Sequence, residues 1–525
     1  MLLAIAWVFC ATHWPLQSLY GLLTSSDRVG NLALVQVVAG GNSPLHTAQA
    51  GQLTFEPFWG LLVAVLSGFN PERVLALYPF LALATCLGFA LALFSSLRSF
   101  SPWERVLVAG FATLLSSAPF EYAGTYRVPW AMTFLLKPNH ALGFVLLPPL
   151  LLAFARIRSW RGRVAVGLLL HVLGWVFVIH MAFVAAGLGL FAAWSFFTRH
   201  DERRKDALDA AVVFGVNLLI VSPYLVMLFV GYPFLYASPR AMIPPFSPHL
   251  LEATLKQGPI FWLGLWGTLV AMRRGDRLGR VFAAQVAAGY FIWASVLALS
   301  ALQLARERDE IYYWIRFLTA AAAGIGAWDL AGRVAAWLRL DALPAPTRCA
   351  AVLALALPWS LPYWWDPLVM DSYVPGSLEP LPDRLRVPTD FIRRRTDPKA
   401  IFAGDRDYAR YVAALGARRV SLGDNFHAPP SARQRNELEQ ELVFDGEGSR
   451  ARALARALDV SYFVVTPRLL AFHAGRARTS GDQEPSRPVP RLAEIDARGH
   501  LERALLWRGP GQDFVAIYRI REAGR

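Results

Sequence analysis

Cysteine is nearly absent from this chain of 525 residues. Its three cysteines, Cys10, Cys86 and Cys349, lie in or beside apolar runs and lack the close spacing of metal ligands. A disulfide framework and a thiolate metal cluster are therefore excluded. The polar C-terminal segment contains no GxGxxG loop, Walker A loop or nucleophile elbow. The chain also shows no internal repeat of the kind found in many transporters.

Charged residues are also scarce, at 17% of the chain, whereas globular proteins average about 25%. Apolar residues make up 55%, and the mean hydropathy is +0.37. Long apolar runs fill positions 1–370, and charge is concentrated from 380 to the end. This asymmetry predicts a membrane bundle over 1–370, including an outer loop at 24–73, and a small soluble α/β domain over 371–525.

The apolar runs predict a polytopic α-helical membrane protein, because a membrane span needs about 20 mainly apolar residues. We expect about eleven transmembrane helices, with the N-terminal run retained as the first. The stretch from Arg163 to Phe197 is too long for one helix, so we place a tight outer turn at Ile179–Met181. The predicted spans are 1–23, 74–96, 103–119, 140–156, 163–179, 181–198, 207–230, 258–272, 280–303, 312–332 and 349–370.

The net charge of +14 does not indicate a nucleic-acid partner, because the basic residues of the first 350 positions lie in short loops between apolar runs. Such loops are cytoplasmic by the positive-inside rule, with anionic membrane lipids as counter-charges. The loops 24–73, 120–139, 231–257 and 304–311 and the C-terminal domain then face outward. Usage rich in arginine and alanine is typical of a GC-rich bacterial genome. The expected location is the bacterial cytoplasmic membrane, with a periplasmic or extracellular tail.

Alternating short apolar segments and helical patterns in the tail predict an α/β domain. Four prolines at 375, 380, 382 and 388 indicate a linker before it. Helices are expected at Asp405–Leu415 and 431–458. The expected strands are Ala400–Ala403, Arg419–Leu422, Tyr462–Thr466, Ala504–Trp507 and Phe514–Tyr518.

Acidic residues on the outer face are the first candidates for chemistry. Asp27 follows the first span and precedes two expected short helices, Asn31–Gly40 and Leu53–Leu66, which either lie in the membrane interface or pack on the bundle. It is either a general base for an acceptor hydroxyl or the N-cap of a helix that starts near Val29. Glu56 and Glu121 are further outer acids that fit a second carboxylate or a metal ligand.

Positive and hydrogen-bonding groups on the same face are candidates for binding a phosphate. Arg127, Lys137 and His140 lie at the start of the fourth span, where helix amides favour an anion. Alternatively, Asn139 caps this helix and Lys137 reaches the lipid headgroups. Two more residues lie within or beside spans. Arg316 needs an anionic partner, either a phosphate or Asp309 or Glu310, and His180 at the outer turn is a substrate contact or a structural histidine.

The architecture resembles the GT-C class of membrane glycosyltransferases. The resemblance rests on Asp27 after the first span, the loop with Gly40-Gly41-Asn42-Ser43-Pro44 and Phe55-Glu56-Pro57-Phe58, and the tail strands Tyr462–Pro467 and Val515–Arg519. It implies sugar transfer from a polyprenyl-phosphate donor to an outer-face glycan, lipid or protein, with Asp27 as the base. Many members carry paired acids here, whereas Asp27 is followed by Arg28. A divalent metal therefore stays open as a cofactor.

Two alternatives belong to other functional classes. A transporter or flippase would be favoured by broken helices, for which Pro148-Pro149 is mild support. A non-catalytic scaffold of the same fold would explain Arg28 in place of a second acid. The long first outer loop and the C-terminal domain count against the transporter.

Overall fold

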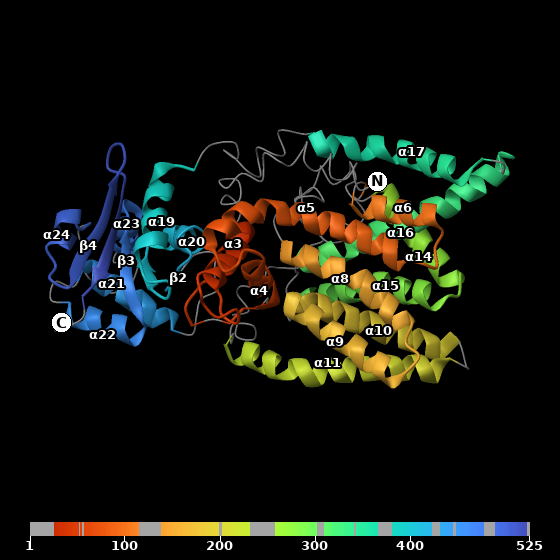
Figure 1. The fold of residues 1–525 in the computed structure, drawn as a ribbon, viewed down its shortest axis with the longest axis horizontal. Helices are drawn as coiled ribbons and strands as arrows, with labels where there is room; N and C mark the ends of the chain where they lie inside the picture. Colours follow the sequence, from red (N-terminus) through yellow and green to blue (C-terminus); the bar gives the residue numbers. More distant parts are fainter. Residues whose placement is uncertain are drawn as a thin grey trace. The chain divides into compact units, whose positions relative to one another are not determined.

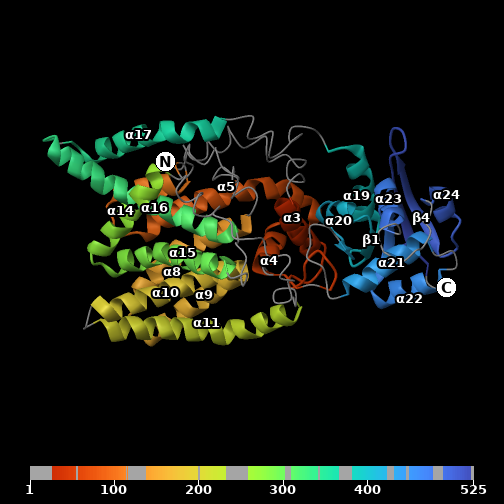
Figure 2. The same cartoon turned by 180° about the vertical axis from the view of Figure 1, so that it is seen from behind.

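The computed structural model describes two compact units, each drawn in Figures 1 and 2. The first comprises residues 1–17, 79–226 and 234–375, and the second comprises 18–78, 227–233 and 376–525. Loop 24–73, expected to belong to the bundle, thus clusters with the C-terminal segment in its described part. The described residues are 26–51, 53–54, 57–113, 115, 138–198, 202–231, 258–301, 309–340, 343–365, 381–422, 431–444, 448–476 and 489–521.

The first unit is a bundle of helices. Every predicted span from the second onward coincides with a helix, and the first, 1–23, lies outside the described residues. The helices are α5 (Pro71–Ser96), α6 (Pro102–Thr113), α8 (Pro138–Ala155), α9 (Trp160–Val176), α10 (Val178–Thr198), α11 (Arg203–Gly231), α14 (Pro259–Arg273), α15 (Arg277–Ala301), α16 (Asp309–Trp337) and α17 (Ala345–Trp365).

Among the described helices, only two stretches are long and apolar enough to cross a membrane by themselves, Val178–Thr198 and Arg203–Met227. A third candidate is a broken pair, Pro57–Leu66 with Pro71–Tyr78, bent by 100°. The count of eleven spans is therefore not confirmed. The expected break in Arg163–Phe197 is present, but it falls at Phe177, whose extended backbone separates α9 from α10.

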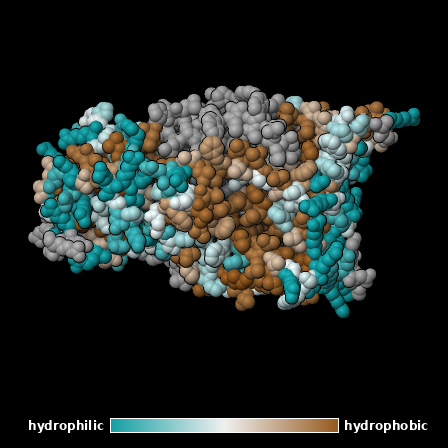
Figure 3. Space-filling model, viewed as in Figure 1, coloured by the Kyte–Doolittle hydropathy of each residue, from teal (hydrophilic) through white to brown (hydrophobic). Residues whose placement is uncertain are grey.

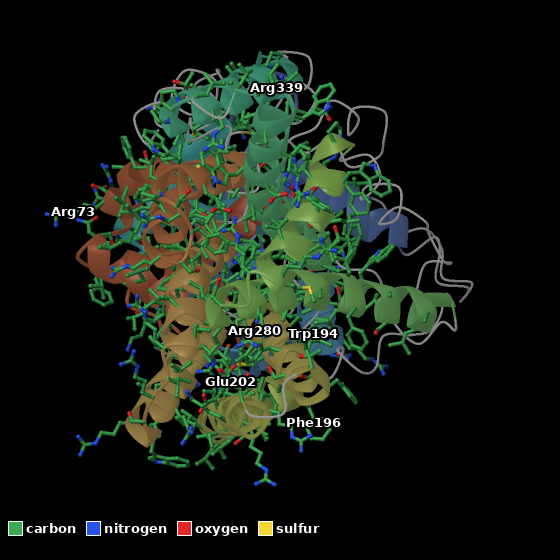
Figure 4. All side chains as sticks on the ribbon, turned by 90° about the vertical axis from the view of Figure 1, so that its right-hand side faces the viewer. Arg73, Trp194, Phe196, Glu202, Arg280 and Arg339 are labelled. Carbon is green, nitrogen blue, oxygen red and sulfur yellow. The ribbon has the colours of Figure 1, made fainter. Side chains whose placement is uncertain are left out.

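One end of the bundle is held together by buried ion pairs. The fully buried Asp209 carboxylate on α11 accepts from Arg163 of α9 at 2.6 Å and from Arg277 of α15 at 2.5 Å. Beside it, Glu202 contacts Arg280 at 3.1 Å (Figure 4). Hydrophobic residues cover the bundle on the face shown in Figure 3, and hydrophilic residues gather at this end. Several arginines of the basic loops therefore have partners within the protein.

The second unit contains a five-stranded sheet in the order β2-β1-β3-β5-β4. The first three strands are mutually parallel, and β5 runs antiparallel to β3 and β4. The strands are β1 (Ile401–Gly404), β2 (Arg419–Val420), β3 (Val460–Val465), β4 (Leu501–Arg508) and β5 (Phe514–Ile520). The helices of this segment are α19 (Asp383–Arg395), α20 (Arg406–Ala414), α21 (Ala432–Phe444), α22 (Ser449–Ala457), α23 (Pro467–Arg476) and α24 (Leu492–Asp496).

The expected linker is partly wrong, because Pro388 lies inside α19. A proline there cannot donate to the carbonyl four residues earlier, which belongs to Arg384. That carbonyl instead accepts a hydrogen bond of 2.8 Å from the buried hydroxyl of Tyr408 on α20. A tertiary contact thus replaces the helix bond that the proline removes.

A carboxylate is buried beneath the sheet. Glu439 of α21 is fully buried, with its Oε2 3.5 Å from Arg406 and 3.8 Å from Nε2 of His473. Burial raises the pKa of Glu439 to about 8, and the nearby Arg406 only partly opposes this shift. The folded unit therefore holds a proton at neutral pH that the unfolded chain releases.

We expect the stability of this unit to fall as pH rises from about 5 to 8. In that window the unfolded carboxyl is already ionised, because its ordinary pKa is 4.5, whereas the folded one is still protonated. The thermal midpoint of the full chain, measured across this range, should fall for the wild type and stay flatter for Glu439→Gln. Glu441→Gln, at a partly exposed site on the same helix, is the control. Equal slopes for wild type and Glu439→Gln would refute this assignment.

Candidate functional site

Asp27 lies in the first turn of α3 (Ser26–Ala39), which begins three residues earlier than expected. A helix start near Val29 is therefore wrong, whereas the role of Asp27, as a cap or as a base, stays a prediction because its side chain lies outside the described part. The described side chains of this helix are mostly buried. Its residues Val29, Leu32 and Val35 are all fully buried, because α3 packs between α4 (Pro57–Leu66) and α20.

The helix that carries Asp27 is fixed at its C-terminal end by long-range contacts. The buried amide of Gln36 donates to the carbonyl of Pro71 at 3.0 Å. Asn42 donates to the carbonyl of Pro398 at 3.3 Å. Gly40 lies so close to the turn before β2 that an added Cβ would come 3.0 Å from the carbonyl oxygen of Ala417.

The chain after α3 extends the sheet by a short parallel pairing. The amide of Ala50 donates to the carbonyl of Val420 in β2 at 2.8 Å, and the amide of Val420 donates to Ala48 at 2.9 Å. Residues 48–50 therefore lie along the β2 edge of the sheet. These contacts make the backbone position of α3 dependent on the folded C-terminal segment.

Within the bundle, two candidate histidines lie together. His140 in the first turn of α8 and His180 in the first turn of α10 have ring centroids 5.8 Å apart. Because α8 begins at Pro138, Asn139 lies inside the helix rather than capping it. Phe177, the residue at the break, contacts both rings, at 3.7 Å from His140 and 4.9 Å from His180. The break thus positions both histidines.

His180 has both ring nitrogens buried and without a hydrogen-bond partner among the described residues. It lies against Phe144 and Trp314, at centroid distances of 4.6 and 5.4 Å. Gly143 faces it from α8, and an added Cβ there would come 2.2 Å from its Nδ1. Buried polar atoms without partners are rare in folded proteins, which makes His180 a candidate binding residue.

Two further polar contacts in this region were missed from the sequence. Trp314 of α16 donates to the carbonyl of Gln285 on α15 at 3.2 Å, and the Gln285 amide lies 3.4 Å from the carbonyl of Val184 on α10. The lone glutamine in an apolar span was the available signal. Arg316 is also fully buried on α16, but it is two positions from Trp314, so the two side chains leave the helix in different directions.

Several candidates cannot be placed. Among the described residues, no group of three histidine, cysteine or acidic side chains could hold a metal. Glu56 and Glu121, the acids proposed as metal ligands, lie outside the described residues, so a metal site stays a prediction. The candidates outside the described side chains are Asp27, Glu56, Glu121, Arg127 and Lys137.

The bundle also has an apolar pocket with a volume of about 410 Å³ between α6, α14, α16 and α17. Its lining is almost wholly aliphatic, and Arg348 is the charged residue in it. The guanidinium of Arg348 lies 4.7 Å from the ring of Trp328. Such a pocket suits a lipid chain better than a polar substrate.

Similar solved structures show which fold class this chain has. The chain has the fold of the GT-C class of membrane glycosyltransferases. It is similar to the apo oligosaccharyltransferase of Archaeoglobus fulgidus, with a TM-score of 0.57, 15% identity, and coverage of 91% of this chain and 70% of that chain.

Two similar structures contain a lipid phosphate. The Archaeoglobus fulgidus enzyme AglB, in complex with an inhibitory peptide and a dolichol-phosphate, matches with a TM-score of 0.55 and 15% identity. The match covers 98% of this chain and 73% of that chain. ArnT from Cupriavidus metallidurans, bound to undecaprenyl phosphate, matches with a TM-score of 0.52, 11% identity and coverage of 98% of both chains. Neither the protein-family models nor the curated protein sequences contain a match.

Proposed function

We propose that this protein transfers a sugar from a polyprenyl-phosphate-linked donor to a glycan, lipid or protein acceptor on the outer face of a bacterial cytoplasmic membrane. The observation that supports it most is the shared fold, because two similar structures contain dolichol phosphate or undecaprenyl phosphate. The C-terminal segment would then be periplasmic or extracellular.

In the proposed reaction, Asp27 takes the proton of an acceptor hydroxyl, whose oxygen forms a bond to the anomeric carbon of the sugar. The bond from that carbon to the donor phosphate breaks, and the phosphate leaves with the electron pair. Positive groups and donors that meet the developing charge lower the barrier. We assign this role to Arg127, Lys137, His140 and Arg316, with His180 as a substrate contact.

The acids Glu56 and Glu121 are proposed as a second carboxylate or as ligands of a divalent metal. The archaeal oligosaccharyltransferase has also been solved with zinc and sulfate, at a TM-score of 0.54 and 14% identity. A metal bound here would neutralise charge on the donor phosphate. The proton transfer from the acceptor is still assigned to Asp27.

Asp27→Asn is expected to reduce sugar transfer at least 100-fold, because the amide cannot accept the proton. The measurement is movement of label from a polyprenyl-phosphate sugar pool into outer-face glycan, in membranes lacking the gene and complemented by each variant. Asp383→Asn, an exposed change of the same kind, is the control and should retain transfer.

Equal transfer by the Asp27→Asn variant would remove Asp27 from the mechanism. No transfer by the wild type would contradict the enzyme proposal itself. In that case, movement of a lipid-linked substrate across sealed vesicles would identify a flippase, and its absence a scaffold.

A further inference from the structure

A polar pocket of about 590 Å³ lies in the second unit, where β3 begins and β5 ends. Small-molecule sites commonly have volumes of roughly 300–1,000 Å³. Its walls come from the last turns of α22, the start of β3 and the paired ends of β4 and β5. The pocket therefore belongs entirely to the C-terminal segment.

Four arginines line this pocket, two from α22, one from the end of β5 and one just after that strand. They are Arg452, Arg456, Arg519 and Arg521. The lining also contains two acids, Asp459 and Glu502, so its formal charge is four minus two, or +2. A concave surface with this excess of guanidinium groups attracts anions.

The arginines are brought together by the turn between α22 and β3 and by the strand register. Asp459 has a left-handed backbone, with φ of 57°, so the chain reverses sharply after Arg456. On β5, Arg519 pairs with Tyr462 of β3 and with Glu502 of β4. The fold thus concentrates positive charge from segments distant in sequence.

Most of this charge is not neutralised by the protein. Within the described ranges, Arg452, Arg456 and Arg519 make no side-chain ion pair or hydrogen bond. Arg521 lies 3.5 Å from Glu502, but both side chains are more than half exposed. An exposed pair of this kind contributes little to stability and leaves most of the positive charge of the pocket available to a ligand.

We propose that this pocket binds a ligand with two or more phosphate groups or a phosphate and a sugar, either a soluble anion or the headgroup of an anionic lipid. Guanidinium groups bind phosphate oxygens through paired hydrogen bonds. Asp459 and Glu502 would accept hydrogen bonds from hydroxyl groups, and the apolar side chains of Val460 and Ile520 complete the lining. This site is additional to the transfer centre proposed above.

The test uses the full chain in phosphatidylcholine nanodiscs, titrated with inorganic pyrophosphate by calorimetry. The double variant Arg452→Gln with Arg519→Gln should bind about tenfold more weakly. The control is Arg433→Gln with Arg508→Gln, which removes the same charge from exposed positions outside the pocket. Its affinity should change less than about twofold.

A second variant gives the opposite expectation. Glu502→Gln raises the formal charge of the pocket from +2 to +3 and releases Arg521, so pyrophosphate should bind about threefold more tightly. Adding cardiolipin, an anionic lipid whose headgroup carries two phosphates, to the nanodiscs separates the two ligand sources. It weakens the apparent affinity if lipid headgroups occupy the pocket and leaves it unchanged if the ligand is soluble. No binding by the wild type, or equal weakening in the control, would overturn the proposal.

Discussion

Replacing Arg418 by methionine is expected to lower the free energy of unfolding of the second unit by about 3–5 kcal/mol. Arg418 follows the turn between α20 and β2 and is only 3% exposed. Its guanidinium donates at 2.8 Å to the carbonyls of both Arg393 and Thr396, and its Nε donates at 3.1 Å to the Thr396 hydroxyl. Methionine keeps much of the volume and removes every donor.

The cost is large because these acceptors have no substitute. The last carbonyls of a helix lack partners within the helix, and α19 ends at Arg395 with Thr396 as its C-cap. Two more carbonyls, of Gly416 and Ala417, accept from Nη1 of the same guanidinium at 3.3 and 3.1 Å. A buried acceptor left without a donor costs about 1–3 kcal/mol.

This loss should extend to the proposed transfer centre. The carbonyl of Ala417 faces Gly40, the residue that follows α3, so a loosened turn would destabilise the position of the helix that carries Asp27. The measurement is thermal unfolding of the full chain together with the rate of tryptic cleavage after residue 381. Arg508→Met is the exposed control, and Arg418→Lys should be intermediate because an ammonium cannot reach all five acceptors. Equal midpoints for Arg418→Met and Arg508→Met would contradict the assigned role.

The helices of the bundle were predictable because span length and hydropathy are local properties of the sequence. The partners of those helices were not. Asp206 and Asp209 lie in segment 199–209, which contains equal numbers of acidic and basic residues. The sequence does not reveal that the Asp209 carboxylate is shared by Arg163 and Arg277. We expected lipid headgroups to neutralise the arginines of these loops, but some of the arginines are neutralised by acids from a different helix.

In the second unit, the strands were predictable from short apolar segments, whereas α19 was not. Its interior Pro388 indicates a linker when only the sequence is considered. The helix is possible because the hydroxyl of Tyr408, twenty-four residues after Arg384, donates to the Arg384 carbonyl. The same limit applies to the loop after α3. Nothing local in Ala48–Ala50 indicates pairing with Val420, because the partner strand lies far along the chain.

For the candidate site, the sequence identified His140 and His180 as separate possibilities at two outer turns. Their proximity depends on the break at Phe177 and on Gly143, which lets α8 approach α10. Close approach of helices at small residues is common in membrane proteins, but a single glycine does not show which residue it faces. The proximity of His140 and His180 is therefore visible only in the folded structure.

Gly143→Ala is expected to destabilise the bundle by about 3 kcal/mol and to abolish most sugar transfer. The new Cβ would lie 2.2 Å from Nδ1 of His180 and 2.9 Å from its Cε1. The ring cannot turn away easily, because Phe144, Phe177 and Trp314 surround it at centroid distances below 5.5 Å. The helices must therefore separate, which displaces both histidines.

A double variant distinguishes this clash from a general effect of alanine on the helix. His180→Ala removes the ring that meets the new methyl group, so Gly143→Ala with His180→Ala should recover the stability lost by Gly143→Ala alone. Gly189→Ala on α10 is the control, since a Cβ there meets nothing within 4 Å. Monodispersity and thermal midpoint in detergent report stability, and label transfer reports activity.

If His180 binds substrate as proposed, the double variant will be stable and still inactive. If His180 is only structural, stability and transfer will recover together, because the bundle is repacked around two small side chains. If Gly143→Ala is as stable and active as Gly189→Ala, the close approach of α8 and α10 at this position is wrong. The three variants thus separate packing from binding at a residue whose ring nitrogens find no partner within the described part of the chain.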